Sequence, residues 1–112
     1  MNSTTIRQGD TLVWLARPGT LDEGVAIDGN WVCRIGLYTT FGTEIIAPFE
    51  VADTYTLSGD EYFIAALTRE QTAAVTTGSY LFVIDVRNDT TSPSYSDESV
   101  IHVTVERQFV AV

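Results

Sequence analysis

The chain has 112 residues, the size of one ordinary domain, and 45% of them are hydrophobic. Its six basic residues are all arginine, and with fifteen carboxylates they give a net charge of −9. Because such a surface repels phosphate groups, the charge argues against nucleic acid and anionic membranes as partners. The longest run of large apolar residues, 80–84, is far shorter than the roughly 20 residues that span a bilayer.

The first residues and the cysteine content bear on where the chain folds. Residues 1–10 lack the basic start and the apolar stretch of a secretory signal, so we expect no export by the general pathway. Cys33 is the only cysteine, which excludes an intramolecular disulfide and fits folding in a reducing cytoplasm. Because the alternation around Cys33 places it on the apolar face of a strand, we interpret it as a buried hydrophobe rather than a reactive thiol.

Short strands separated by turns are predicted for the first part of the chain. Residues 11–17 are rich in apolar side chains and end at Pro18-Gly19, a turn pair. Residues 25–27 are expected to form a second strand, with Asp28-Gly29 supplying the positive φ angles of a tight hairpin. The alternation is clearest over 31–38, where the side chains expected to point inward are Trp31, Cys33, Ile35 and Leu37, with Arg34 outward.

Three further strands are predicted in the middle of the chain. They cover residues 43–51, 53–57 and 62–67, the last after a turn at 58–60. Pro48 cannot donate a backbone hydrogen bond, so the strand that contains it should lie at a sheet edge or carry a bulge.

A short helix is expected to interrupt the strands at residues 68–77. Thr68 and Gln71 have the spacing of a capping box, in which each side chain bonds to the backbone of the other residue. Gly78 is the expected stop of this helix. We predict that this helical turn carries the chain from one sheet to the other.

The last part of the chain predicts two more strands. In 80–86 alternate residues are large and apolar, and Tyr80 at the head of the strand suits the tyrosine corner of an immunoglobulin-like sandwich. Residues 87–98 are polar and rich in turn formers, so we expect a mobile hairpin loop there. Residues 100–105 form the closing strand, with Ile101, Val103 and Val105 inward.

These patterns together predict an all-β fold. We expect residues 1–112 to form a single domain, an immunoglobulin-like antiparallel β-sandwich of seven to eight strands with one short helical turn. About twenty large apolar side chains can share one core, each stabilising it by roughly 1.5 to 3 kcal/mol on burial. That core suffices for one sandwich but not for two domains.

Groups for catalysis or for zinc binding are sparse in the sequence. The single histidine, His102, lies in the middle of a predicted strand, and no Gly-x-Ser-x-Gly nucleophile motif occurs. One cysteine and one histidine cannot fill a tetrahedral zinc site from a single chain. The acidic loops at 21–24, 58–61 and 96–98 lack the ligand spacing of a calcium loop, so we interpret them as solvated turns. We therefore predict no enzymatic activity, no cofactor and no metal ligands.

The end of the chain is the more suggestive feature. Apolar residues near a terminus lower solubility unless they are covered. Either the last strand runs longer than predicted, or the tail docks on another subunit. The candidate interface residues are Phe109, Val110 and Val112, with Phe41 and Phe49 as weaker candidates.

Two stretches resemble a known family. Residues 6–11 before the first predicted strand, and residues 67–86 around the helical turn, are similar to small immunoglobulin-like β-sandwich domains of bacteriophage virion proteins. The nearest type is the N-terminal domain of baseplate upper proteins and its single-domain relatives. One departure is Asp97-Glu98-Ser99, where relatives often have a glycine. The structural motif residues are Gly9, Asp10, Thr11, Thr68, Gln71, Thr72, Gly78 and Tyr80.

The resemblance implies a virion structural subunit, made in the host cytoplasm and assembled in many copies. The expected partners are other virion proteins and copies of the chain itself, with tail or baseplate favoured over capsid decoration. A carbohydrate-binding module is the alternative from another functional class. Its stacking platform would use exposed tyrosines among Tyr38, Tyr55, Tyr62 and Tyr95.

Overall fold

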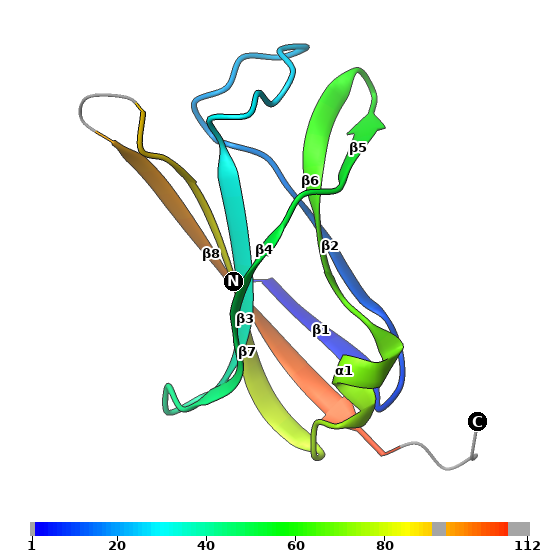
Figure 1. Cartoon of the computed structure of the whole chain (residues 1–112). Coiled ribbons are helices and arrows are strands. Elements are labelled where there is room, and N and C mark those ends of the chain that lie inside the picture. The colour runs from blue at the N-terminus through cyan, green and yellow to red at the C-terminus, as the bar shows by residue number, and fades with distance from the viewer. Residues whose placement is uncertain (1, 91–93, 108–112) are drawn as a thin grey trace.

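The computed structural model describes residues 2–90 and 94–107, and they form two β-sheets packed face to face (Figure 1). Five strands form the large sheet in the order β1-β8-β7-β3-β4, and three form the small sheet in the order β2-β6-β5. The elements, in chain order, are β1 (Asn2–Arg7), β2 (Leu12–Ala16), β3 (Val32–Thr39), β4 (Glu44–Val51), β5 (Thr54–Leu57), β6 (Asp60–Leu67), α1 (Arg69–Ala73), β7 (Gly78–Asn88) and β8 (Tyr95–Glu106). The all-β sandwich with one short helix is therefore confirmed.

The strand order follows the immunoglobulin layout. The small sheet corresponds to strands B, E and D of that layout, and β8-β7-β3-β4 corresponds to G, F, C and C′. All these pairs are antiparallel, as expected, but β1 pairs in parallel with β8. The sandwich is thus antiparallel except at one edge.

The core lies between the two sheets, because most strands that face it point alternate side chains inward. In β3 the side chains of Cys33, Ile35 and Leu37 point inward, and in β6 those of Phe63, Ala65 and Leu67 do. All six are at most 4% exposed. The predicted inward sets are confirmed for Cys33, Ile35 and Leu37 in β3 and for the alternating residues of β7 and β8, while Trp31 lies just before β3 and is only partly buried. Both sheets bury their inner faces in one shared cluster.

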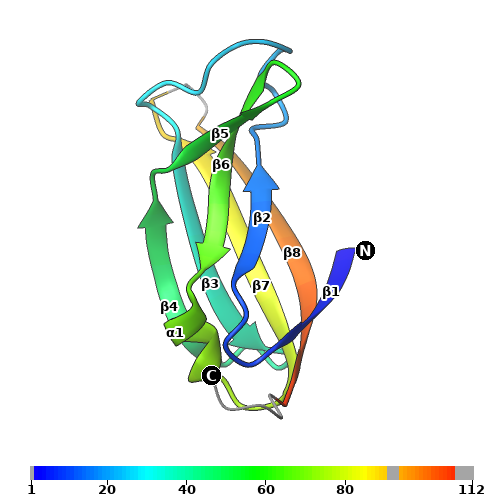
Figure 2. The ribbon, with the colours of Figure 1, turned by 90° about the vertical axis from the view of Figure 1, so that its right-hand side faces the viewer.

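The helix α1 carries the chain from the small sheet to the large sheet, as predicted (Figure 2). The capping box is confirmed, since the Gln71 amide donates to Thr68 Oγ1 at 3.2 Å and the Thr68 amide donates to Gln71 Oε1 at 2.8 Å. The predicted helix over 68–77 is too long, because α1 ends at Ala73. Gly78 does not stop it but begins β7, at a φ of +150°.

Tyr80 forms the predicted tyrosine corner. Its hydroxyl donates to the Thr76 carbonyl at 2.7 Å and lies 2.8 Å from Thr76 Oγ1. The Tyr80 side chain is only 6% exposed, so these bonds satisfy a polar group that burial would otherwise leave unpaired.

Residues 25–27 are not a strand, contrary to the prediction. They lie in a loop whose backbone bonds to side chains of β6, because the Gly24 amide donates to Asp60 Oδ1 and the Ile27 amide donates to Glu61 Oε1. Asp28-Gly29 does form a turn, but with no strand before it there is no hairpin. The carboxylates of Asp60 and Glu61 thus accept backbone hydrogen bonds that, in a paired strand, a neighbouring strand would accept.

Two strands extend beyond their predicted ends, and one strand was not predicted. The segment 87–98, expected to be a mobile loop, is paired strand at both of its ends, since β7 and β8 stay in register out to the Asn88–Tyr95 pair. Strand β1 was missed because its sequence, Asn2 to Arg7, is polar and lacks apolar alternation. Backbone pairing to β8 forms it instead.

The two alternatives for Pro48 both hold. Strand β4 lies at the edge of the large sheet, and its register against β3 shifts between the Ile35–Phe49 and Leu37–Ile46 pairs. Pro48 lies within this bulge, so no backbone donor is missing from the pairing.

Candidate functional site

The motif residues near the N-terminus and those of α1 come together in space. Gly9 and Asp10 form a turn in which the Arg7 amide donates to Asp10 Oδ2 at 2.9 Å. Thr72 Oγ1 donates to the Asp10 carbonyl at 2.6 Å, and Arg69 Nε donates to the Gly9 carbonyl at 3.1 Å. Helix α1 therefore fixes the connection between β1 and β2, while Thr11 is exposed just ahead of β2. This arrangement is structural and presents no reactive group.

The candidate interface residues are not gathered at one place. Phe41 lies in the turn between β3 and β4 and is 96% exposed. Phe49, by contrast, packs against the core. Phe109, Val110 and Val112 lie outside the described residues.

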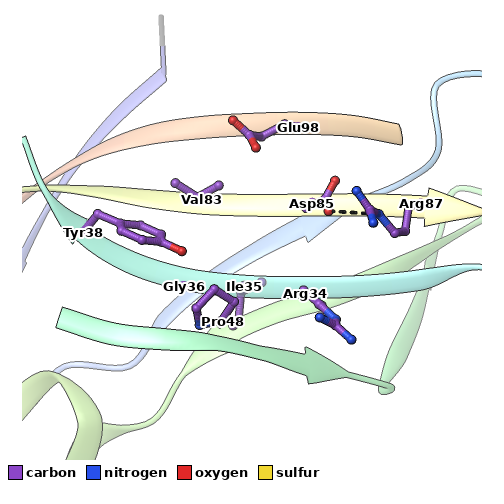
Figure 3. A pocket seen from close by; sticks show the side chains of 9 residues that line it. All are labelled: Arg34, Ile35, Gly36, Tyr38, Pro48, Val83, Asp85, Arg87 and Glu98. Atoms are coloured by element: carbon purple, nitrogen blue, oxygen red, sulfur yellow. Dashed lines mark ion pairs between the residues drawn. The ribbon is translucent and has the colours of Figure 1, made fainter. Parts of the chain in front are cut away.

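A hollow of about 240 Å³ opens on the outer face of the large sheet, and Gly36 is one of the residues that line it. A Cβ at Gly36 would come within 3.2 Å of the Ile46 carbonyl oxygen, 3.2 Å of the Tyr38 ring and 3.4 Å of Pro48 Cα. The β4 bulge at Pro48 and the Tyr38 ring thus pack closely around Gly36, and a larger side chain there would require these neighbours to shift. We call this depression the Gly36 hollow, and its lining residues are Arg34, Ile35, Gly36, Tyr38, Pro48, Val83, Asp85, Arg87 and Glu98 (Figure 3).

Charged groups of both signs surround the Gly36 hollow. Arg87 Nε lies 3.3 Å from Asp85 Oδ2, and Ser96 Oγ donates to the other oxygen of Asp85 at 3.1 Å. The side chain of Arg34 makes no hydrogen bond or ion pair with any described residue. Its guanidinium is therefore available to a carboxylate or another anionic group. Figure 3 shows Glu98 of β8 on the opposite side of the hollow from Arg34.

The Cys33 thiol lies on the inner side of this sheet. Burial, and secondarily the negative charge of Asp85, raises the pKa of Cys33 to about 12. The thiol is fully covered and neutral at physiological pH, as the sequence predicted for a buried hydrophobe.

The outer face of the small sheet differs in kind from the outer face of the large sheet. Along β2 and β6 the side chains that point away from the core are apolar, and the exposed ends of β5 continue the same pattern. Val13, Tyr55 and Leu57 are 51%, 53% and 47% exposed. We call this surface the small-sheet face, and its residues are Val13, Leu15, Tyr55, Leu57, Tyr62, Ile64 and Ala66. Figure 2 views the molecule from this side.

Charge is confined to one end of the small-sheet face. There Arg17 approaches Asp60 at 3.9 Å, and its guanidinium also donates to the Glu61 carbonyl at 2.8 Å. The Arg17 side chain is only 10% exposed, so this cation is largely covered. The rest of the face offers neither a charge nor a strong hydrogen-bond donor beyond the two tyrosine hydroxyls.

The four tyrosines considered as a sugar platform lie at three separate places. Tyr38 borders the Gly36 hollow, and Tyr55 and Tyr62 are cross-strand partners on the small-sheet face. Tyr95 packs edge-on against Trp31, with ring centroids 5.5 Å apart. A stacking platform on this chain would therefore use only some of these four tyrosines. Sequence reasoning missed both the Gly36 hollow and the small-sheet face, although Gly36 inside a strong strand pattern was an available signal.

A scan against protein-family models finds no match, and a search of curated proteins finds no similar sequence. Within residues 2–90 and 94–107, no three His, Cys, Asp or Glu side chains cluster as a metal site requires. No helix in that part of the chain is long and apolar enough to cross a membrane.

Proposed function

We propose that this chain is a non-enzymatic structural or adaptor subunit of a bacteriophage particle, located in the tail or baseplate. In this proposal it is made in the host cytoplasm and contacts neighbouring subunits through the small-sheet face. The observation that carries the proposal is the exposure of Val13, Tyr55 and Leu57 on one sheet face. The assignment to a bacteriophage particle rests on the resemblance of residues 6–11 and 67–86 to virion sandwich domains.

The small-sheet face supports a contact role for a physical reason. Contiguous apolar patches larger than a few hundred Å² are uncommon on monomeric proteins, and the largest apolar patch of a protein often has a binding function. In a chain of net charge −9, most of the surface keeps other acidic proteins at a distance. An uncharged face is then the region where a neighbour can approach without burying unpaired carboxylates.

Fractionation of purified particles tests the proposal. Particles of the phage that encodes the chain should contain it in many copies, and after disruption it should sediment with tails or baseplates. Sedimentation with heads would instead assign capsid decoration, the competing site of assembly. Absence from purified particles would refute both assignments.

The end of the chain provides a second test of the same proposal. Deleting residues 109–112 is expected to leave the cooperative unfolding transition in place while removing the chain from particles, if the apolar tail docks on a neighbour. Thermal unfolding followed by circular dichroism and quantification in purified particles would measure the two effects. An unfolded truncated chain would show that the tail belongs to the core instead.

The Gly36 hollow favours a second candidate function, the binding of a sugar. An aromatic ring, two carboxylates and the unpaired Arg34 guanidinium border one depression, and such groups can stack on a sugar ring and bond to its hydroxyls. Glycan-array binding that is lost in Tyr38→Ala and kept in Tyr55→Ala would support this function. A chain that binds no glycan would eliminate it.

A further inference from the structure

Two charged side chains of opposite sign face each other across the Gly36 hollow. The guanidinium of Arg34 on β3 and the carboxylate of Glu98 on β8 lie on opposite sides of it (Figure 3). Within the described part of the chain, neither side chain takes part in a hydrogen bond or an ion pair. Glu50, the register partner of Arg34 on β4, makes no ion pair with it either. Both charges are therefore available to a ligand.

Asp85 lies between Arg34 and Glu98 in one row of cross-strand partners, and its own carboxylate already has partners. Arg87 Nε lies 3.3 Å from Asp85 Oδ2, and Ser96 Oγ donates to Asp85 Oδ1 at 3.1 Å. Glu98 is nevertheless left directly opposite a carboxylate, and like charges opposite each other in a sheet are destabilising. A positively charged group beside Glu98 would relieve this repulsion.

The rest of the lining of the hollow is uncharged. It consists of the Tyr38 ring, Val83, Pro48 and the backbone around Gly36. Figure 3 shows Tyr38 and Val83 on the side of the hollow away from Arg87. The volume of about 240 Å³ lies below the about 300 to 1,000 Å³ of sites for drug-sized ligands, so the hollow fits one smaller molecule. A positive group, a negative group and an apolar wall thus surround a space of that size.

We propose that the Gly36 hollow binds a free α-amino acid with an apolar side chain, as its zwitterion. The guanidinium of Arg34 donates to the carboxylate of the ligand, a pairing that its fork of N–H groups suits. The ammonium group of the ligand donates to Glu98. Its apolar side chain lies against the Tyr38 ring and Val83. This inference goes beyond the proposed function, because it assigns a small ligand to a surface that the subunit contacts proposed there do not use.

Charge favours a zwitterion over a ligand of one sign. The net charge of −9 repels a small anion, and the guanidinium of Arg34 repels a small cation at close range. A zwitterion has no net charge and still forms an ion pair with each wall of the hollow, whereas a sugar brings uncharged hydroxyls to both. Because Arg34 and Glu98 are exposed, each ion pair contributes little, and we expect binding in the millimolar range.

Nuclear magnetic resonance titration of the full-length chain with L-phenylalanine tests the binding. The backbone amide signals of Gly36 and Val83 should shift with ligand concentration and reach saturation, while those of Leu15 and Ile64 on the small-sheet face should not. Absence of a saturable shift at Gly36 and Val83 overturns the inference. Glucose is titrated in parallel, and shifts at these two amides as large as those with phenylalanine would also overturn it, in favour of a sugar site.

Two derivatives of phenylalanine test the two charged contacts separately. The methyl ester lacks the carboxylate and keeps the ammonium group, and the N-acetyl derivative lacks the ammonium group and keeps the carboxylate. Each should bind about two- to fivefold more weakly than phenylalanine itself, as expected for the loss of one exposed ion pair. The titrations are compared at about 0.15 M salt, where the long-range effect of the net charge is screened. Equal or tighter binding of either derivative overturns the zwitterion assignment.

Matched variants assign each contact to its side chain. Arg34→Gln should abolish the difference in affinity between phenylalanine and its methyl ester, and Glu98→Gln should abolish the difference between phenylalanine and its N-acetyl derivative. Arg7→Gln and Glu106→Gln are the controls, because they make the same changes of charge at paired positions of β1 and β8 outside the hollow. All four side chains are exposed, so the variants should remain folded. Variants that discriminate between the ligands as their controls do would overturn the inference.

Discussion

The two outer faces of the sandwich are built from the same strand geometry and carry opposite chemistry. On the large sheet, the outward positions include Arg34, Asp85 and Glu98, and they surround a hollow. On the small sheet, the outward positions are almost all apolar although solvent reaches them. The side-chain period of two places residues on a face, but it does not say whether the face will be solvated or covered. The small sheet therefore exposes apolar side chains on its outer side, whereas the large sheet surrounds its hollow with charged ones.

The difference also separates two kinds of binding. The large-sheet face offers a local depression with an unpaired guanidinium, which suits a small polar ligand or one side chain. The small-sheet face offers exposed apolar side chains from neighbouring strands, which suit an apolar surface rather than a charged ligand. A core truncation is expected to destabilise both sheets, and a substitution in the hollow should disrupt the large-sheet face alone. A surface substitution should alter one face without affecting the fold.

The largest effect is expected from Phe82→Ala, which removes the support of both faces. Phe82 is fully buried in the shared core, so the truncation should lower the free energy of unfolding by about 3 to 5 kcal/mol. Urea unfolding measures this loss. Leu81→Ala, on the solvent side of the same strand, is the control and should cost clearly less.

Gly36→Val should break the large-sheet face alone. The new side chain would collide with the β4 backbone and the Tyr38 ring, and such overpacking costs about 1 to 3 kcal/mol. Gly29→Ala is the matched control, because nothing lies within 4 Å of a Cβ at Gly29. Equal stability of Gly36→Val and the parent chain would mean that the hollow is not closed around Gly36.

Raising the pH should weaken the large sheet through Cys33. The pKa of the thiol is about 12 in the folded chain and 9.0 in the unfolded chain, so between these values the folded state binds more protons. Stability from this group is therefore complete below pH 9 and falls by about 1.4 kcal/mol per pH unit as the pH rises towards 12. Chemical unfolding of the parent chain and of Cys33→Val at several alkaline pH values would isolate the contribution of the Cys33 thiol to the free energy of unfolding. If the free energies of unfolding of the two chains fell equally with pH, Cys33 would not be the source of the pH dependence.

The smallest change in stability is expected on the small-sheet face itself. Leu57→Asp alters an exposed side chain, so the free energy of unfolding should stay within about 0.5 kcal/mol. The same variant should nevertheless bind less of a fluorescent hydrophobic dye, because it places a charge on the apolar patch. Phe41→Ser, at an exposed turn, should leave dye binding nearly unchanged. A larger loss with Phe41→Ser would mean that the patch is not the dye site.

The candidate sites were harder to predict than the fold, for a physical reason. The inward sets in β3 and β7, the capping box and the tyrosine corner all follow from local patterns, and all are present. The hollow depends on the contact between Gly36 in β3 and the bulge at Pro48 in β4. These two positions are apart in the sequence, so no local pattern reveals the contact. The small-sheet face depends on how β2, β5 and β6 align, and their separate patterns do not reveal that register.

The sequence by itself determined the sandwich, because alternating apolar side chains must bury one side of each strand whatever the neighbours are. It also determined the helical turn at Thr68, since the bonds of a capping box join residues three apart. Only the tertiary structure decided that the polar segment at Asn2 to Arg7 is a strand, through backbone bonds to β8. Only the tertiary structure showed that outward apolar residues from three strands lie together on the outer face of the small sheet. Strand pairing is non-local, so the outer surface of a sheet is set by register and not by any one segment.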